Sequence, residues 1–242
     1  MGFATSATCL WLLHTGNKRQ LSEESLKNES IGTSVLAGMK YIRTDKALML
    51  IILVIAGLNF SLIGPYMVGI PVLAAQRLPE GATAFGLLMS AYAGGNLVGF
   101  MMAGFLPRPS GKAMSMILIS LMVAFGVVFA ALGFIQSTWV DFTLMLPLGL
   151  GNGYIYIVLF SWVQTRVPKE MLGRMMSILA FSSYGLMPVS QAISGAVVKW
   201  NLDILFFSAG ALVLLLALWT AFQHALKIFS ESLAAQEVLA DS

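Results

Sequence analysis

The chain has 242 residues, of which 58% are hydrophobic and only 10% are charged, and its formal net charge is +3. A water-soluble fold of this size could not cover its surface with so few polar groups, so the composition excludes a soluble globular protein and indicates a lipid environment. The few basic residues lie in short clusters between apolar runs, a pattern that argues against nucleic-acid binding.

The first stretch, residues 1–15, is weakly apolar and too short to span a bilayer, which requires about 20 residues. Lys18 and Arg19 follow this stretch, whereas a secretory signal peptide carries its basic residues in front of its apolar core. We therefore interpret residues 1–15 as the remnant of a preceding transmembrane helix. Cys9 is the only cysteine, which excludes an intrachain disulfide and a cysteine-cluster metal site, and we expect no cofactor.

Residues 16–45 differ from the rest of the chain because they are polar at first and carry mixed charge. Within them, the segment 34–43 places apolar side chains on one helical face, at Val35, Leu36, Met39 and Ile42. This spacing predicts a short amphipathic helix that lies on the membrane surface within a linker.

Six long apolar runs follow, and none of them contains Asp, Glu, Lys or Arg. Each run is long enough to cross a hydrocarbon core of about 30 Å as a helix. A segment inside lipid must satisfy its own backbone hydrogen bonds, so the runs predict an all-α, polytopic bundle of six transmembrane helices over residues 46–228, with a polar tail at 229–242. The runs are residues 47–76, 84–106, 113–135, 142–165, 175–198 and 204–226.

The distribution of charge predicts how this bundle is oriented. The loops between the runs are short, which makes neighbouring helices antiparallel. All Lys and Arg residues except Arg77 and Lys199 then fall on the side of the chain termini. Loops rich in Lys and Arg stay in the cytoplasm, so the linker at 16–45 and the tail at 229–242 are predicted to be cytoplasmic.

Neutral polar residues within the spans are the candidates for a binding site, because such groups are costly against lipid. One interpretation is a cavity wall for an amphipathic, mostly apolar solute, with tyrosine rings stacking against it and amides orienting it. The other is hydrogen bonding between helices without any ligand. Because several helices contribute, we favour the cavity for the set as a whole. The candidates are Asn59, Tyr66, Tyr92, Asn96, Asn152, Tyr156, Gln164, Tyr184 and Gln191.

Glycines and prolines predict how the spans pack and bend. Two pairs have the GxxxG spacing that is typical of close helix contacts, Gly95 with Gly99 and Gly149 with Gly153. Each proline inside a span removes an intrahelical hydrogen bond and favours a kink, which suits a rocking transporter but is also tolerated in other membrane helices. These prolines are Pro65, Pro71, Pro147 and Pro188.

A charged segment at 166–174 joins the fourth and fifth runs on the predicted cytoplasmic side. Glu170 lies where the fifth helix is expected to begin, so its charge complements the helix dipole. Arg166 and Arg174 can pair with Glu170. The segment is either a cytoplasmic gate that forms and breaks as the cavity changes its opening, or a static cap whose charges set the topology.

Four segments in the second half of the chain carry a family resemblance: residues 148–154 (LGLGNGY), 166–177 (RVPKEMLGRMMS), 184–188 (YGLMP) and 194–195 (SG). They resemble helices ten and eleven of the major facilitator superfamily, within the branch of macrolide-efflux-like and enterobactin-exporter-like bacterial exporters. Residues 91–104 are similar to helix eight of the same transporters. The loop from Gly104 to Lys112 departs from the family pattern, because it lacks the usual Asp.

The resemblance implies the C-terminal half of a twelve-helix transporter, with its six helices arranged as 3+3 inverted repeats. It also implies alternating access, a small-molecule substrate, export and a place in the bacterial inner membrane. The central site of such a transporter lies between two six-helix halves, so we expect a partner, either an N-terminal half or a second copy. Because six helices form only one wall of the cavity, the chain alone is expected not to transport.

Two other classes of protein compete with this interpretation. A non-transporting membrane subunit that pairs with another membrane protein fits the same chain length. An intramembrane serine protease would need a Gly-x-Ser-Gly motif and a histidine deep in a span. The chain has no such motif, and His14 and His224 fall outside the spans or near a membrane edge. We therefore expect no enzymatic activity.

Overall fold

The computed structural model describes residues 40–106, 111–168 and 171–231, and all regular structure in these ranges is helical. The predicted segments 1–15 and most of 16–45 and 229–242 lie outside the described residues. Residues 40–44 and 224–231 are also helical. The elements, in chain order, are α3 (Lys46–Gly64), η1 (Pro65–Gly69), α4 (Ile70–Arg77), α5 (Ala82–Phe105), α6 (Gly111–Leu132), α7 (Thr138–Arg166), α8 (Leu172–Ala180), η3 (Phe181–Gly185), α9 (Met187–Trp200) and α10 (Leu202–Ala221).

Five helical stretches of the described chain are long and apolar enough to cross a membrane: Lys46–Arg77, Ala82–Phe105, Gly111–Leu132, Thr138–Arg166 and Leu202–Ala221. The fifth predicted run, 175–198, is helical as well, but it is not one continuous α-helix. It is divided into α8, the π-helical turn η3 and α9. Pro188 stands at the start of α9, where its missing N–H costs nothing, and so the proline that predicted a kink marks a new helix instead.

Two helices begin a few residues before the uncharged runs that predicted them, and each of these helices therefore contains an acidic residue in its first turn. Asp141 lies in the first turn of α7 and Asp203 in the first turn of α10. Asp141 is 0% exposed, and within the described residues neither of its carboxylate oxygens accepts a hydrogen bond. The sequence boundary at residue 142 missed this buried acid because apolar composition does not reveal where a helix begins.

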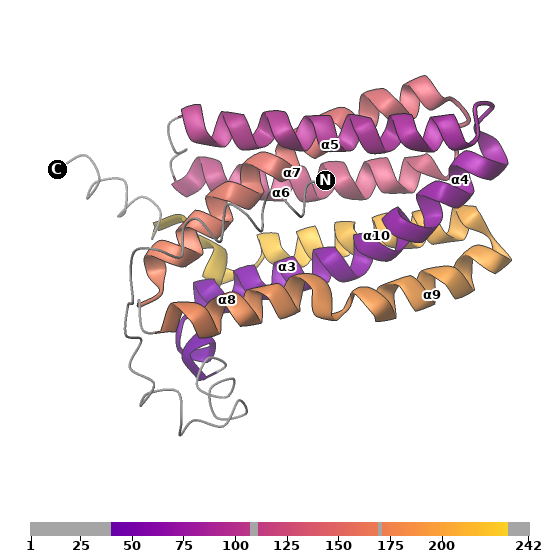
Figure 1. The fold of residues 1–242 in the computed structure, drawn as a ribbon. Coiled ribbons are helices and arrows are strands. Elements are labelled where there is room, and N and C mark those ends of the chain that lie inside the picture. The colour runs from indigo at the N-terminus through magenta and orange to yellow at the C-terminus, as the bar shows by residue number, and fades with distance from the viewer. Residues whose placement is uncertain (1–39, 107–110, 169–170, 232–242) are drawn as a thin grey trace, which may run out of the picture. The chain divides into compact units, whose positions relative to one another are not determined.

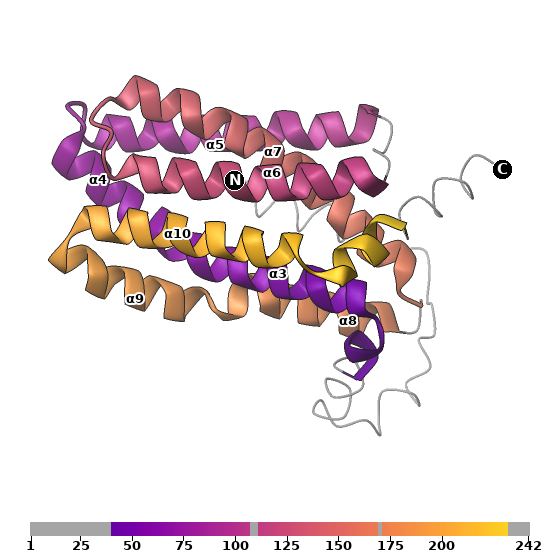
Figure 2. The same ribbon diagram turned by 180° about the vertical axis from the view of Figure 1, so that it is seen from behind.

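The bundle has two layers, which both views show (Figures 1 and 2). One layer contains α5, α6 and α7, and the other contains α3 with α4, α8 with α9, and α10. At one end of the bundle, which we call the basic end, Asp45 pairs with Arg166, Gly111 lies against Ser230, and Trp162 contacts Phe229. Arg77, Glu80, Thr138 and Asp203 lie at the opposite end, which we call the far end.

Glycines bring α5 and α7 into backbone contact, as the two GxxxG pairs predicted. A methyl group at Gly99 would meet the carbonyl oxygen of Leu150, and a methyl group at Gly153 would meet that of Asn96. Gly95 and Gly149 make the equivalent contacts one turn away. The two pairs therefore face each other, and their role is close helix packing.

A serine of α9, Ser190, forms hydrogen bonds to the backbone at the C-terminal end of α3. The hydroxyl of Ser190 accepts a hydrogen bond from the Gly64 N–H at 2.9 Å and donates one to the carbonyl oxygen of Phe60 at 2.6 Å. A regular α-helix would pair those two backbone groups with each other. The inserted hydroxyl, followed by Pro65 at the start of the π-helical turn η1, accounts for the interruption between α3 and α4.

Candidate functional site

A cavity of about 420 Å³ lies inside the bundle, between α3, η1, α6, α7 and the α8–η3 segment. Its lining is mostly aliphatic and aromatic, and it contains no Asp, Glu, Lys, Arg or His. The cavity extends from Val54, Leu118 and Val163, toward the basic end, to Tyr66 and Phe129 in the middle of the bundle. A cavity of this size and character fits a small, largely apolar molecule.

The cavity brings most of the predicted polar residues together. Those that line it are Asn59, Tyr66, Tyr92, Asn152, Tyr156 and Tyr184. Asn96, Gln164 and Gln191 do not line it. Asn96 lies behind Asn152 and is bonded to it, Gln164 is exposed near the basic end of α7, and Gln191 is half-buried in α9. That any of these residues binds a solute stays a prediction.

Aromatic rings form two of the cavity walls. The rings of Tyr66 and Tyr92 are tilted against each other with their centroids 5.2 Å apart. The ring of Tyr156 stacks on Phe160 at 6.0 Å, with only 9° between the planes. Both arrangements are of the kind that aromatic pairs favour. The flat faces of these rings give an apolar solute surfaces on which to stack.

The amide side chains are held by hydrogen bonds. Asn59 Nδ2 donates to the carbonyl oxygen of Ile55 at 2.8 Å, within its own helix. Asn152 Nδ2 donates to Asn96 Oδ1 at 2.9 Å, from α7 to α5. The Asn96–Asn152 bond is the interhelical contact that the competing interpretation predicted, although Asn152 also lines the cavity. Asn152 therefore contributes both to the packing of α7 against α5 and to the cavity wall.

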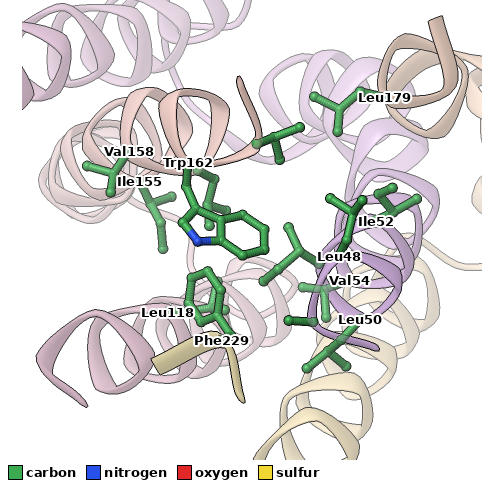
Figure 3. Packing of buried hydrophobic residues seen from close by; sticks show 14 of the residues in the cluster. Leu48, Leu50, Ile52, Val54, Leu118, Ile155, Val158, Trp162, Leu179 and Phe229 are labelled. Carbon is green, nitrogen blue, oxygen red and sulfur yellow. The ribbon is translucent and has the colours of Figure 1, made fainter. Parts of the chain in front are cut away.

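A layer of buried side chains closes the cavity toward the basic end. Ile51 and Met114 lie one turn closer to that end than the lining residues Val54 and Leu118, and both are 0% exposed. Figure 3 shows Trp162 directed from α7 toward the side chains of α3, with the ring of Phe229 against it. The Trp162 and Phe229 rings meet edge to face, with centroids 4.8 Å apart.

Phe229 corrects the predicted boundary of the polar tail at residue 229. It is 0% exposed, belongs to the hydrophobic core, and is carried by the helical residues 224–231. The carbonyl of Ser230 lies so close to Gly111 that a methyl group there would collide with it. The polypeptide after α10 therefore returns to the bundle and packs against α6 and α7 at the basic end.

An ion pair ties α3 to α7 beside this layer. Arg166 Nε lies 2.5 Å from Asp45 Oδ2, and the Arg166 guanidinium lies over the Trp162 ring at 5.3 Å from its centroid. The other oxygen of Asp45 caps α3 by accepting from the N–H groups of Ala47 and Leu48. Burial acts to raise the pKa of the Asp45 carboxyl, but these hydrogen bonds and the Arg166 charge together hold it below its usual value.

Of the three predicted gate residues, the structure describes Arg166 and Arg174 but not Glu170. Arg166 lies at the basic end and pairs with Asp45, a partner that sequence reasoning missed because 121 residues separate the two. Glu170 lies outside the described residues, so the predicted pairing with it stays a prediction. Arg174 lies in α8. Trp162 was missed because an aromatic residue within an apolar run carries no sign of where it points, and Phe229 was missed because it falls in the segment predicted to be a polar tail.

The far end has polar links of its own. Arg77 pairs with Asp203 at 2.5 Å and also donates to the carbonyl oxygen of Gly133. The hydroxyl of Thr138 donates to a carboxylate oxygen of Glu80. These contacts join the end of α4 to the start of α10, and the loop before α5 to the start of α7. Each end of the bundle therefore has an ion pair that joins two helices or their caps.

Comparison with known proteins identifies the family. No curated protein and no solved structure matches the chain. The sequence model of the Major Facilitator Superfamily matches residues 1–190, which is more than half of the chain. Its members are membrane transporters, in agreement with the long apolar helices and with the uncharged cavity between them. The chain is therefore a multi-pass membrane protein that belongs to the Major Facilitator Superfamily.

Proposed function

We propose that the chain forms one wall of the pathway by which a small, amphipathic and mostly apolar solute is exported across the bacterial inner membrane. The observation that carries this proposal is the cavity of about 420 Å³, lined by apolar side chains, tyrosines, two asparagines and Ser183, without any Asp, Glu, Lys, Arg or His. An anionic solute would lose its hydration there without gaining a counter-charge, and the aliphatic and aromatic lining favours a solute with an apolar body. The outward direction is inferred from the resemblance to bacterial exporters.

The wall is incomplete, which supports a second six-helix unit as partner. Tyr156 and Tyr184 line the cavity and yet are 50% and 63% exposed. A binding site usually encloses most of its ligand, so another surface must cover these rings when a solute is bound. We propose that an N-terminal half or a second copy of the chain supplies that surface, and that the chain as a monomer is inactive.

The basic end is the proposed cytoplasmic side, since Lys46, Lys112, Arg166 and Lys227 lie at this end of the helices. In the described conformation the layer that contains Trp162 and Phe229 closes the cavity toward that side. Alternating access then requires this layer and the Asp45–Arg166 ion pair to separate. We propose that they form the cytoplasmic gate, with the segment 166–174 as part of it.

The partner is the first point to test. In a Cys9→Ser background, a cysteine at Tyr184 is treated with a bifunctional maleimide in native membranes, and Leu215→Cys, at an exposed position of α10, serves as the matched control. A six-helix partner, whether a second copy or another polypeptide, should be captured through Tyr184→Cys and not through Leu215→Cys. Capture of an unrelated membrane protein would favour the alternative, a non-transporting subunit.

Transport itself is tested in proteoliposomes with rhodamine 6G as the amphipathic probe. The chain reconstituted as a monomer should show no vectorial uptake, and co-reconstitution with the captured six-helix partner should produce it. Uptake by the monomer would contradict the proposal that one chain forms only part of the cavity wall. A partner that restores no uptake of this probe or of other amphipathic dyes would contradict the transport proposal.

A further inference from the structure

The polarity that the cavity presents to a solute follows from how its two asparagine amides are held. Asn59 lines the cavity from α3, and its Nδ2 donates to the carbonyl oxygen of Ile55 at 2.8 Å. Turning this amide over would place its oxygen against another oxygen, which is repulsive. The backbone of α3 therefore holds the nitrogen of Asn59 toward the helix and leaves the Oδ1 atom free.

The orientation of Asn152 is set in two steps. Asn96 Nδ2 donates to the carbonyl oxygen of Tyr92 at 3.0 Å, which directs Asn96 Oδ1 toward α7. Asn152 Nδ2 donates to that oxygen at 2.9 Å. Because the first acceptor in this chain is a backbone carbonyl, neither amide can turn over without losing a hydrogen bond. Asn152 Oδ1 is thus left as the free acceptor of a residue that lines the cavity.

Both amides therefore offer the same chemistry. Within the described residues, no hydrogen bond reaches Asn59 Oδ1 or Asn152 Oδ1, while each Nδ2 already has an acceptor. The tyrosine rings in the wall add the negative faces of their π-systems. No cationic side chain lines the cavity to balance these groups. The hydroxyls of the lining tyrosines and of Ser183 can donate as well as accept, whereas the two free amide oxygens can only accept. The amides therefore favour a hydrogen-bond donor, and a wall without a cation is an unfavourable neighbour for a negative charge.

We infer that the cavity selects solutes whose polar end is a hydrogen-bond donor, such as a hydroxyl or an ammonium group, and that it discriminates against carboxylates. Asn59 and Asn152 determine this specificity by accepting the donor. Asn96 is a positioning residue, because it does not line the cavity and acts only by holding Asn152. The inference rests on the proposed solute-binding function of the same cavity and gives that function a substrate class.

Four anthracenes with one apolar body and different polar ends test the inference. They carry a hydroxymethyl, an aminomethyl, a methoxymethyl or a carboxylate group, and their binding to the full chain in nanodiscs is read by energy transfer from tryptophan, with empty nanodiscs as the blank. The wild-type chain should bind the hydroxymethyl and aminomethyl compounds about fivefold more tightly than the methoxymethyl compound, the effect of one net hydrogen bond. The carboxylate should bind most weakly.

Variants separate the roles of the amides. Asn152→Leu should remove most of the preference for the hydroxymethyl over the methoxymethyl compound, while the affinity for the methoxymethyl compound stays the same. Asn59→Leu should do likewise, and it keeps the α5–α7 interface intact because Asn59 bonds only within its own helix. Asn96→Leu should reduce the preference by freeing the Asn152 amide. Gln191→Leu, which does not line the cavity, is the matched control and should change nothing.

Two kinds of failure can be told apart. If all four compounds bind the wild-type chain equally, or if the carboxylate binds best, the inference about donors is wrong while the cavity still binds apolar solutes. If none of the four binds above the empty-nanodisc blank, the proposed binding function fails and the inference fails with it. A preference that survives in both Asn59→Leu and Asn152→Leu would also overturn it.

Discussion

Arg166 and Asp45 join the end of α7 to the start of α3, with Arg166 Nε 2.5 Å from Asp45 Oδ2. The pair lies beside the aromatic contact between Trp162 and Phe229, because the same guanidinium lies over the Trp162 ring. Charge, cation–π and aromatic contacts thus meet at one point of the basic end. Because Arg166 contacts both Asp45 and Trp162, it cannot move without disturbing the layer that closes the cavity.

Acid should weaken this link through Asp45. The pKa of Asp45 lies below its usual value of 3.8 in the folded chain, so its contribution to stability is present above that pH and is lost as the pH falls through the lower folded value. Asp45→Asn keeps an amide that can cap α3 but removes the charge. We expect the variant to be less stable than the wild type at pH 7, and the difference to vanish at the acid end of the range.

Thermal unfolding in detergent between pH 7 and pH 2.5 measures this difference. Other carboxyl groups titrate equally in both proteins, so the comparison isolates Asp45. A stability difference that stays constant across the whole range would contradict the ion pair.

Closing the space at Gly99 should damage the contact between α5 and α7. A methyl group there would meet the carbonyl oxygen of Leu150, a backbone atom that cannot move aside. We expect Gly99→Ala to destabilise the bundle by about 2 kcal/mol, the size of an overpacking effect. Gly94→Ala is the control on the same helix, because a methyl group there meets nothing within 4 Å. Equal melting temperatures of the two variants would rule out the proposed packing.

Removing the hydroxyl of Ser190 should loosen the join between α9 and α3. The hydroxyl bonds Gly64 and Phe60 at once, so Ser190→Ala leaves two backbone groups of α3 without their present partner. We expect a loss of about 1 kcal/mol, typical of interhelical hydrogen bonds in membranes. Faster amide hydrogen exchange should appear around Gly64. Ser120→Ala is the control, since Ser120 is exposed and bonds only within its own helix; if it had the same effect, the insertion would have no special role.

Truncation of Phe229 should destabilise the basic end. Its ring is fully buried against Trp162, and removal of such a ring leaves a cavity. We expect Phe229→Ala to cost about 3 kcal/mol and to increase quenching of tryptophan fluorescence by iodide. Phe222→Ala, at a position that is 82% exposed, should change neither quantity. Unchanged quenching in Phe229→Ala would show that the ring does not shield Trp162.

Local patterns predicted the elements of the fold well. The six apolar runs and the GxxxG pairs depend on residues near one another in sequence, and the structure confirms that all six runs are helical and that the two glycine pairs make close helix contacts. The cavity-lining set was also largely visible, because neutral polar groups in lipid must face inward and several of them converge on one space.

What the sequence could not reveal depends on contacts between distant segments. Arg166 had a nearby acid at Glu170, and only the fold brings Asp45 to it across 121 residues. Phe229 was assigned to a polar tail because most of the residues after it are polar. It is buried because the polypeptide turns back after α10 and brings its ring against Trp162. Gln164 and Gln191 are neutral polar residues within apolar runs, as the lining residues are, but they do not line the cavity.

The reactivity of a single cysteine at Tyr156 tests the central claim, a solute cavity within a membrane bundle, most directly. In a Cys9→Ser background, membranes are treated with a membrane-impermeant maleimide, with Leu215→Cys as the control at an exposed position outside the cavity. The account predicts that Tyr156→Cys reacts, that 9-(hydroxymethyl)anthracene slows its reaction, and that Leu215→Cys shows no such protection. A Tyr156→Cys that never reacts, or that reacts at the same rate with and without the solute, would contradict it.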